Sequence, residues 1–320
     1  MNSFSINRFG RTLHWVVGVN FRKLLMWTSG VAMAVFAGEL ILMKIDHSDY
    51  PHRQIDGFAL MGWLIFIFAS LILTSSIVSS IHEKRKREAF LMLPASSLEK
   101  YLSLLLYTTF ISIVCIFLAI VVGDSLRMLW VWVSGYADDK VNPYVVDNAG
   151  NQIHWWSSAV SRMWYALTQN FQSSGHSFIF NEGHTKQVEL LTNGYIVAQY
   201  ALFFAFVMWI HSLFLAGGTF LRKYAFVISG IVFILIMWLF AQIMTTFHLD
   251  LYEYKYFVEY GREGFENYET AVRMVNSSIA GIVLVLLLAF SCFNYWASYR
   301  IFKGFQLISN KWTNYDILKR

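Results

Sequence analysis

Two ionisable side chains lie inside apolar stretches long enough to cross a bilayer, which makes them the first candidates for chemistry. Glu39 lies about two-thirds of the way along the first stretch, and His211 lies about one turn before the end of the fourth. A charge in hydrocarbon costs at least about 2.5 kcal/mol, so each group needs a partner, water or a neutral form. We interpret both as candidates for lining a pathway or pairing helices. The alternative is a side chain that snorkels to the nearer interface or is neutral and hydrogen-bonded.

Motifs for catalysis or metal binding are missing from the chain. It contains no G-x-x-x-x-G-K-[ST] phosphate loop, no H-E-x-x-H and no G-x-S-x-G, so we assign no catalytic residue. Any ATP that it uses must be hydrolysed by another chain. His176, Glu182 and His184 have no regular metal-ligand spacing, and neither do His47 and His52. We interpret these five residues as solvated and expect no metal or cofactor in this chain.

The composition is that of a membrane protein. Hydrophobic residues make up 57% of the 320 residues, aromatic residues 18% and charged residues only 14%, and the mean hydropathy is +0.47. Soluble domains are about a quarter charged. Both cysteines lie in apolar runs, which excludes a disulfide framework. We therefore expect an all-α polytopic membrane protein with a lipid partner and no nucleic-acid partner.

Six stretches meet the requirement of roughly 20 apolar helical residues for a hydrocarbon core about 30 Å thick. They are 24–43, 58–81, 101–122, 195–215, 224–246 and 275–295. Residues 4–23 before the first span have an apolar side and a basic side, the pattern of an interfacial helix; a polar leader is the alternative. The apolar run to Met43 is longer than a signal-peptide core, which favours a retained anchor over cleavage.

The charge distribution predicts the orientation. Segments 1–23, 82–100, 216–223 and 296–320 together contain sixteen lysines and arginines and four acidic residues, whereas the rest of the chain has nine and sixteen. By the positive-inside rule both termini are cytoplasmic. The chain is then a single transmembrane domain, 1–320, with outer loops at 123–194 and 247–274. The first loop is rich in tryptophan and either rests on the outer interface or forms a small cap domain.

The segment 82–100 encodes a basic run, an apolar patch at Phe90, Leu91 and Leu93, and a break at Pro94. Proline stops the first helix, and Ser96 or Ser97 can cap the next one, with Glu99 or Lys100 in its first turn. A short helix with exposed apolar residues beside the membrane is a docking surface for a cytoplasmic partner. The alternative is an ordinary positive-inside loop.

Small residues predict two further features. Gly30, Ala34 and Gly38 recur every four residues in the first span, which lets another helix approach closely, either within the chain or in a second subunit. Gly217-Gly218-Thr219 is interpreted as a tight cytoplasmic turn between the fourth and fifth spans.

This order of elements resembles the permease subunits of ABC-2-type transporters, of a bacterial, Bacteroidetes-like kind. An amphipathic N-terminal helix and two spans are followed by an elbow ending in Leu93-Pro94-Ala95-Ser96 and Glu99-Lys100, and then by four spans. His211-Ser212-Leu213-Phe214 before Gly217-Gly218 also resembles the turn after the fourth span of such proteins. The outer loop of about seventy residues and the charged segment before the sixth span differ from the family pattern.

The resemblance implies that segment 82–100 is the coupling helix, which seats in a groove of a separate ABC ATPase subunit that binds the ATP. The coupling residues would be Arg87, Glu88, Leu91, Leu93, Pro94, Ala95, Ser96, Glu99 and Lys100. It also implies a homodimer or heterodimer of permeases in the bacterial cytoplasmic (inner) membrane that exports a cargo. The rival hypothesis is a non-transport membrane protein whose outer Trp-rich loop binds a ligand or partner. An integral-membrane enzyme would need several polar groups at one depth, which the sequence lacks.

Overall fold

The structure is a computed structural model of the chain. It describes residues 4–45, 50–80, 84–137, 144–146, 152–173, 177–181, 184–188, 193–221, 224–249, 251–259, 269–276 and 278–304. The chain forms two compact units, and we describe each by itself. The first comprises Met1–Tyr165, Phe214–Val227 and Ala297–Arg320, and the second comprises Ala166–Leu213 and Ile228–Trp296.

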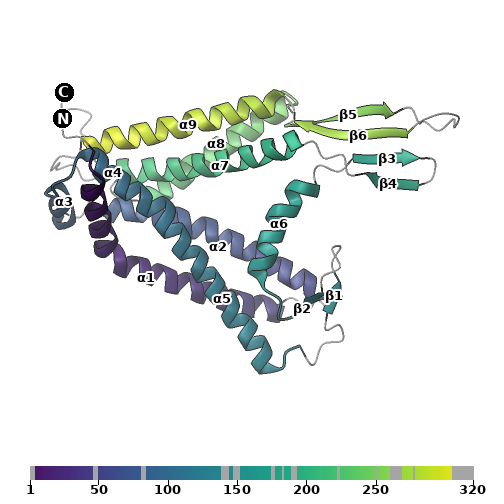
Figure 1. The fold of residues 1–320 in the computed structure, drawn as a ribbon, viewed down its shortest axis with the longest axis horizontal. Helices are drawn as coiled ribbons and strands as arrows, with labels where there is room; N and C mark the ends of the chain where they lie inside the picture. The colour runs from purple at the N-terminus through teal and green to yellow at the C-terminus, as the bar shows by residue number, and fades with distance from the viewer. Residues whose placement is uncertain are drawn as a thin grey trace. The chain divides into compact units, whose positions relative to one another are not determined.

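The helices carry most of the described residues. They are α1 (Ile6–Ile45), α2 (Pro51–Ser80), α3 (Lys84–Leu91), α4 (Ser97–Leu106), the π-helical turn η1 (Tyr107–Ile111), α5 (Ser112–Ser134), α6 (Ala159–Ser173), α7 (Asn193–Phe220), α8 (Ala225–Thr246) and α9 (Ser278–Lys303) (Figure 1). The strands are β1 (Tyr144–Val146), β2 (Gln152–His154), β3 (Ser177–Asn181), β4 (His184–Val188), β5 (Tyr252–Glu259) and β6 (Glu269–Asn276).

The prediction of six apolar helices of membrane-spanning length is confirmed. Among the described residues, six helices are long and apolar enough to cross a membrane: Ile6–Ile45, Pro51–Ser76, Ser97–Ser134, Val197–Phe220, Ala225–Thr246 and Ser278–Lys303. Several helix ends differ from the predicted ones, and two of the differences bear on the packing of the chain. The third helix continues past Val122 to Ser134, because charged residues that end the apolar run are buried against α1 instead of facing water. The prediction of a turn at Gly217-Gly218-Thr219 is wrong, because all three residues are helical and α7 ends at Phe220.

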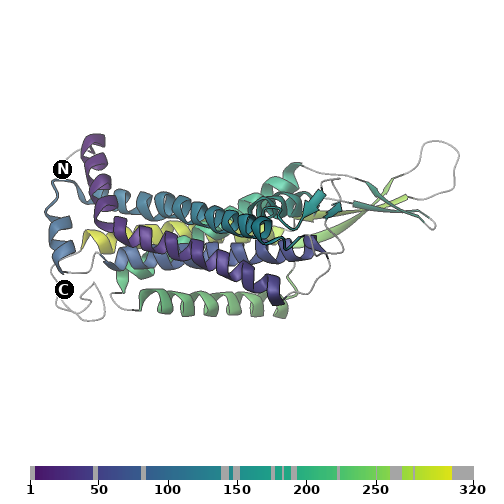
Figure 2. The same ribbon diagram turned by 90° about the horizontal axis from the view of Figure 1, so that it is seen from below.

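Helix α1 is continuous through the predicted boundary between the interfacial segment and the first span. Figure 2 shows that its first turns run in a different direction from the rest of the helix. The side-chain amide of Asn20 donates to the carbonyl of Val16, 2.9 Å away. A side chain that inserts into the helical hydrogen-bond ladder is a known cause of helix bending. A bent α1 fits a helix that changes from the membrane surface to a span.

In the first unit, α1, α2 and α5 pack along one another (Figures 1 and 2). The α1–α5 contact is close because Gly123 has no side chain. A Cβ atom at this position would lie 2.7 Å from the carbonyl oxygen of Ala32 and 2.8 Å from Cβ of Val35. Gly218 of α7 plays the same part against α2, where a Cβ would lie 3.1 Å from the carbonyl oxygen of Ser75.

We expect Gly123→Ala to destabilise the first unit by about 1–3 kcal/mol, because the new methyl group overlaps backbone that cannot move aside locally. The measurement is thermal unfolding of the purified chain in detergent or nanodiscs. Gly18→Ala is the control: it adds the same methyl group to α1, where nothing lies within 4 Å of the added atom. An unchanged midpoint for Gly123→Ala would contradict the tight α1–α5 contact.

The predicted outer loops contain strands as well as helix. β1 and β2 form a short antiparallel hairpin in the first unit. In the second unit a four-stranded antiparallel sheet has the order β4-β3-β6-β5 (Figure 1). Phe178 of β3 is paired with Val272 of β6, so one sheet joins the two predicted outer loops, 123–194 and 247–274. Antiparallel pairing gives hydrogen-bond partners to the backbone groups that face one another in these strands.

Candidate functional site

The elbow, residues 84–100, is built from two helices separated by a proline-containing turn. Helix α3 ends at Leu91, three residues before Pro94, and the Ala95 amide donates to the carbonyl of Leu93 across the proline. Ser96 is the N-cap of α4: its hydroxyl oxygen accepts from the Glu99 amide at 3.2 Å. The Glu99 carboxylate in turn accepts from the Ser96 amide at 2.7 Å, which completes a capping box. The local sequence therefore fixes the angle between the two helices.

Glu99 also joins the elbow to the start of α1. Its Oε1 atom accepts from the backbone amide of Ser5 at 2.7 Å and from the Arg8 guanidinium at 3.1 Å. The Glu99 side chain is fully shielded from solvent, whereas that of Arg8 is 34% exposed. One carboxylate thus receives donors from two helical segments that are far apart in sequence. These contacts attach the elbow to the N-terminal helix.

Lys100 and Phe90 complete the attachment. The Lys100 ammonium donates to the carbonyl of Leu91 at 2.8 Å, which satisfies an acceptor at the end of α3. The Phe90 ring is buried, stacks on Trp15 of α1 with centroids 5.5 Å apart, and meets Phe302 of α9 edge-on at 5.9 Å. The elbow is therefore held by α1 on one side and by the end of α9 on the other.

The exposed apolar surface of the elbow differs from the predicted one. Phe90 was expected on the docking patch, but it is buried because it anchors the elbow. The exposed apolar side chains are Met92 at 83%, Leu98 at 42% and Leu91 at 37% of their accessible area. Pro94 is exposed too, and Glu88, Leu93, Ala95 and Ser96 are half-buried. The side chain of Arg87 and residues 82 and 83 lie outside the described part of the chain.

We expect Glu99→Ala to free the N-terminal helix from the elbow, because the change removes the acceptor for both Ser5 and Arg8 and breaks the capping box. Limited proteolysis at Arg8 and Arg11 in native membranes measures this, and cleavage should become several-fold faster. Glu88→Ala is the control, since it removes a carboxylate from α3 and leaves the Glu99 contacts in place. Equal cleavage of Glu99→Ala and the unmodified chain would contradict the attachment.

A buried ion cluster lies elsewhere in the first unit and consists of Glu39 on α1 with Asp124 and Arg127 on α5. All three residues are at most 1% exposed. Arg127 Nη2 donates to Asp124 Oδ1 at 2.6 Å, and Nε lies 3.1 Å from the same oxygen. Nε is also 3.2 Å from Glu39 Oε2. Paired charges and full hydrogen bonding are what make buried ions tolerable in an apolar interior.

The rest of the Arg127 guanidinium contacts the segment between β2 and α6. Nη1 donates to the carbonyl of Trp155 at 3.2 Å, and Nη2 donates to that of Ser157 at 2.7 Å. The guanidinium carbon lies 5.0 Å from the ring centroid of Phe58 on α2, within cation–π range. One side chain therefore connects α5 to α1, to α2 and to the segment that precedes α6.

Asp124 holds the start of α6. Its Oδ2 atom accepts from the Ser158 hydroxyl at 2.7 Å and from the Val160 amide at 3.2 Å. A carboxylate at a helix N-terminus is favourable because it satisfies free amides and complements the helix dipole. Around the cluster, Met43, Ile55, Val131 and Trp155 are buried in one apolar group. Trp155 is thus a core residue, whereas Trp156 and Trp164 of the same predicted loop are exposed.

Sequence reasoning selected Glu39 but missed its two partners. Asp124 and Arg127 were placed in an outer loop because they interrupt the apolar run. The signal that would have found them is their spacing, since an acid and a base three residues apart face the same side of a helix. Their common orientation towards one glutamate on another helix requires the structure.

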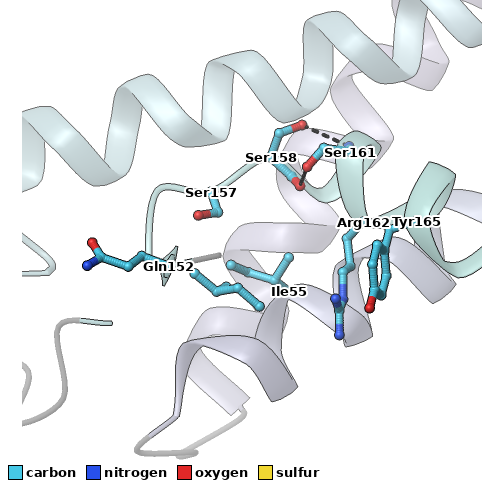
Figure 3. A pocket seen from close by; sticks show the side chains of 8 residues that line it. Ile55, Gln152, Ser157, Ser158, Ser161, Arg162 and Tyr165 are labelled. Atoms are coloured by element: carbon cyan, nitrogen blue, oxygen red, sulfur yellow. Dashed lines mark hydrogen bonds between the residues drawn. The ribbon is translucent and has the colours of Figure 1, made fainter. Parts of the chain in front are cut away.

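A pocket of about 270 Å³ opens beside this cluster (Figure 3). Three serine hydroxyls contribute to its lining, together with Gln152, Arg162, Tyr165 and two isoleucines. Arg162 is ion-paired with Asp56 of α2 at 2.5 Å and lies 4.6 Å from the Tyr165 ring centroid. Ser158 both lines the pocket and donates to Asp124, so the pocket wall is part of the cluster's hydrogen-bond network.

His211 pairs helices in the second unit. Its Nδ1 atom lies 2.9 Å from the hydroxyl of Tyr295 on α9, and the next residue, Ser212, accepts from the Asn294 amide at 3.1 Å. These two contacts tie α7 to α9. Helix pairing is therefore the interpretation of His211 that this geometry favours.

The predicted small-residue stripe and the candidate metal ligands are the remaining residues that the sequence singles out. Gly38 contacts the Met61 side chain of α2, and an added Cβ would lie 2.7 Å from its sulfur. Gly30 has open space around it and Ala34 is exposed, so neither contributes to packing within the described part of the first unit. His176 and Glu182, considered as metal ligands, lie outside the described residues. No group of three metal-binding side chains occurs in the residues that are described.

The fold and these sites define a multi-pass helical membrane protein. Comparison of the chain with protein-family models, with curated proteins and with solved structures finds no match.

Proposed function

We propose that this chain is a permease subunit of an ATP-driven exporter of the ABC-2 type, which receives its driving force from a separate ATPase chain through the elbow. The observation that supports the proposal is that the elbow combines exposed apolar residues with residues that attach it to other helices. Met92, Leu91 and Leu98 are exposed, while Glu99, Lys100 and Phe90 attach the same segment to α1 and α9.

Both halves of this combination are needed for mechanical coupling. Exposed apolar side chains on a segment that faces water are a surface that a partner can bury on binding. A segment that docks but is loosely tethered would move without displacing the spans. Here a push on the elbow is transmitted to α1 through the Glu99 carboxylate and the Trp15–Phe90 stack, and to α9 through Phe302. The basic and apolar composition of the elbow fits the cytoplasmic side of a bacterial inner membrane.

In this account the ATP is bound and hydrolysed by the partner, and two permease chains enclose the pathway, because six helices rarely enclose one alone. Gly30 and Ala34, which are open in the described unit, are the residues that we assign to the contact between subunits. The cargo is a substrate with little charge, since few charged groups lie in the spans.

Affinity purification from native membranes tests this function. A tagged chain should recover an ATPase subunit with a Walker motif in stoichiometric amount, identified by mass spectrometry. Gene neighbourhood provides an independent check, because an adjacent ATPase gene is expected. Recovery of the intact chain with no ATPase from mild detergent and from nanodiscs would contradict the proposal.

A second candidate is a non-transport membrane protein that binds a ligand through its Trp-rich segment. The pocket beside Ser158 and Arg162 favours it, because hydroxyls and a guanidinium converge there beside the buried ion cluster. The two candidates differ in one result. If the chain is a permease, the Arg162→Ala variant should recover as much ATPase as the unmodified chain. If its function is ligand binding, neither the variant nor the unmodified chain should recover an ATPase.

A further inference from the structure

The buried ion cluster holds one more negative group than positive groups. Glu39 and Asp124 are both carboxyl groups, and Arg127 is the single cation that contacts them among the described residues. A net charge enclosed by apolar side chains is expensive, and the cost is lowest when the surplus carboxyl takes up a proton. The question is then which of the two carboxyl groups holds it.

The hydrogen bonds distinguish them. Asp124 accepts from Arg127 Nε and Nη2, from the Ser158 hydroxyl and from the Val160 amide, so both of its oxygens are well supplied with donors. Glu39 Oε2 is buried and accepts no hydrogen bond in the described part of the chain, although Arg127 Nε lies 3.2 Å away. The guanidinium directs its hydrogens to Asp124 and to the carbonyls of Trp155 and Ser157.

The other charged groups nearby are engaged elsewhere. On α2 and α6, Asp56 and Arg162 form their own ion pair. On β2, the imidazole of His154 is stacked on Trp156, with ring centroids 4.5 Å apart. From α2 the cluster meets the apolar ring of Phe58. Among the described residues, the balance of charge at Glu39 is therefore decided by Arg127 and Asp124.

We propose that Glu39 is a proton-binding site, whose carboxyl group is held neutral between α1 and α5 while Asp124 is the ionised partner of Arg127. Loss of the proton to water leaves two carboxylates on one guanidinium and loosens the α1–α5 contact. The site therefore makes the closure of these helices dependent on proton concentration. This inference is independent of the proposed ATPase coupling, and it would hold in a protein with no partner.

Paired substitutions test the proposal. Glutamine has the shape of the neutral glutamic acid, so Glu39→Gln should keep the thermal midpoint of the chain in nanodiscs at neutral pH. Asp124→Asn should lower it, because asparagine cannot neutralise Arg127. A fall in midpoint as large for Glu39→Gln as for Asp124→Asn would overturn the assignment.

The pH dependence of the stability of the chain is a second test of the proposal. The native chain holds a proton that the unfolded chain releases above mildly acidic pH, so stability must fall as pH rises through the titration of the site. Between the pH at which the unfolded carboxyl ionises and the higher pH at which the buried one does, the unfolding equilibrium constant of the unmodified chain should rise by about tenfold per pH unit. Glu39→Asp should retain this dependence and Glu39→Gln should lose it. The same dependence in Glu39→Gln would overturn the proposal.

Infrared spectroscopy of the unmodified chain tests the proposal even if the Glu39→Gln variant fails to accumulate in the membrane. A protonated carboxyl band, shifted by isotope labelling of glutamate and lost on raising the pH, is expected. Its absence at neutral pH would overturn the proposal. So would a midpoint that depends on sodium in place of choline, because the site would then be neutralised by a metal cation.

Discussion

Arg127→Met is expected to lower the stability of the first unit by about 3–5 kcal/mol, the range for breaking a buried ion pair by removing one partner. The methionine side chain fills much of the same volume, so the loss comes mainly from the unpaired Asp124 carboxylate. The change also removes the donors to the Trp155 and Ser157 carbonyls, which fix the segment before α6. Thermal unfolding in nanodiscs and recovery as a single species on size exclusion measure the effect.

Two comparisons isolate the cause of that loss. Arg162→Met removes an arginine of the same region whose side chain and partner Asp56 are 22% and 48% exposed, and an ion pair of this kind contributes about 0–1 kcal/mol. Combining Arg127→Met with Asp124→Asn should recover part of the stability, because no charge is left unpaired at that position. The explanation by buried charge would be wrong if Arg162→Met lowered the stability as much as Arg127→Met. It would also be wrong if the double variant were no more stable than Arg127→Met alone.

Met92→Asp is expected to abolish recovery of the ATPase while leaving the chain folded. Met92 is 83% exposed, so the substitution removes no internal contact of the elbow but places a charge where a partner would bury apolar surface. Affinity purification from membranes of cells producing each variant measures the ATPase that accompanies the chain.

Tyr224→Asp is the matched control for Met92→Asp. Tyr224 is 65% exposed and lies just before α8, next to the segment 216–223 that is predicted to be cytoplasmic. It gains the same charge for the loss of an aromatic side chain. Its ATPase recovery should equal that of the unmodified chain. Full recovery with Met92→Asp would show that the elbow surface is not the docking surface.

The sequence predicted what depends on local pattern. The six spans follow from runs of apolar residues, and the end of α3 before Pro94 and the cap at Ser96 follow from the chemistry of proline and serine. The continuation of α5 past Val122 was missed, because a hydropathy criterion treats Asp124 and Arg127 as a boundary. Their burial depends on Glu39, which is distant in sequence.

Other features depend on contacts that no local pattern contains. Phe90 belongs to the same apolar run as Leu91, yet it is buried because Trp15 and Phe302 meet it from two other helices. Gly123 is important because Ala32 lies opposite, whereas the regular stripe of Gly30, Ala34 and Gly38 includes positions that are open. The pairing of β3 with β6 joins segments separated by two long helices, and turn signals carry no information about it.

The central claim is that the exposed apolar surface of the elbow contacts an ATPase inside the cell. Photo-cross-linking from a reactive amino acid at position 92, in native membranes and without purification, tests it most directly. The account predicts one dominant adduct between this chain and a Walker-motif ATPase, and protection of position 92 from membrane-impermeant reagents added outside the cell. Labelling of position 92 from outside, or adducts to lipid and unrelated proteins with none to an ATPase, would contradict it.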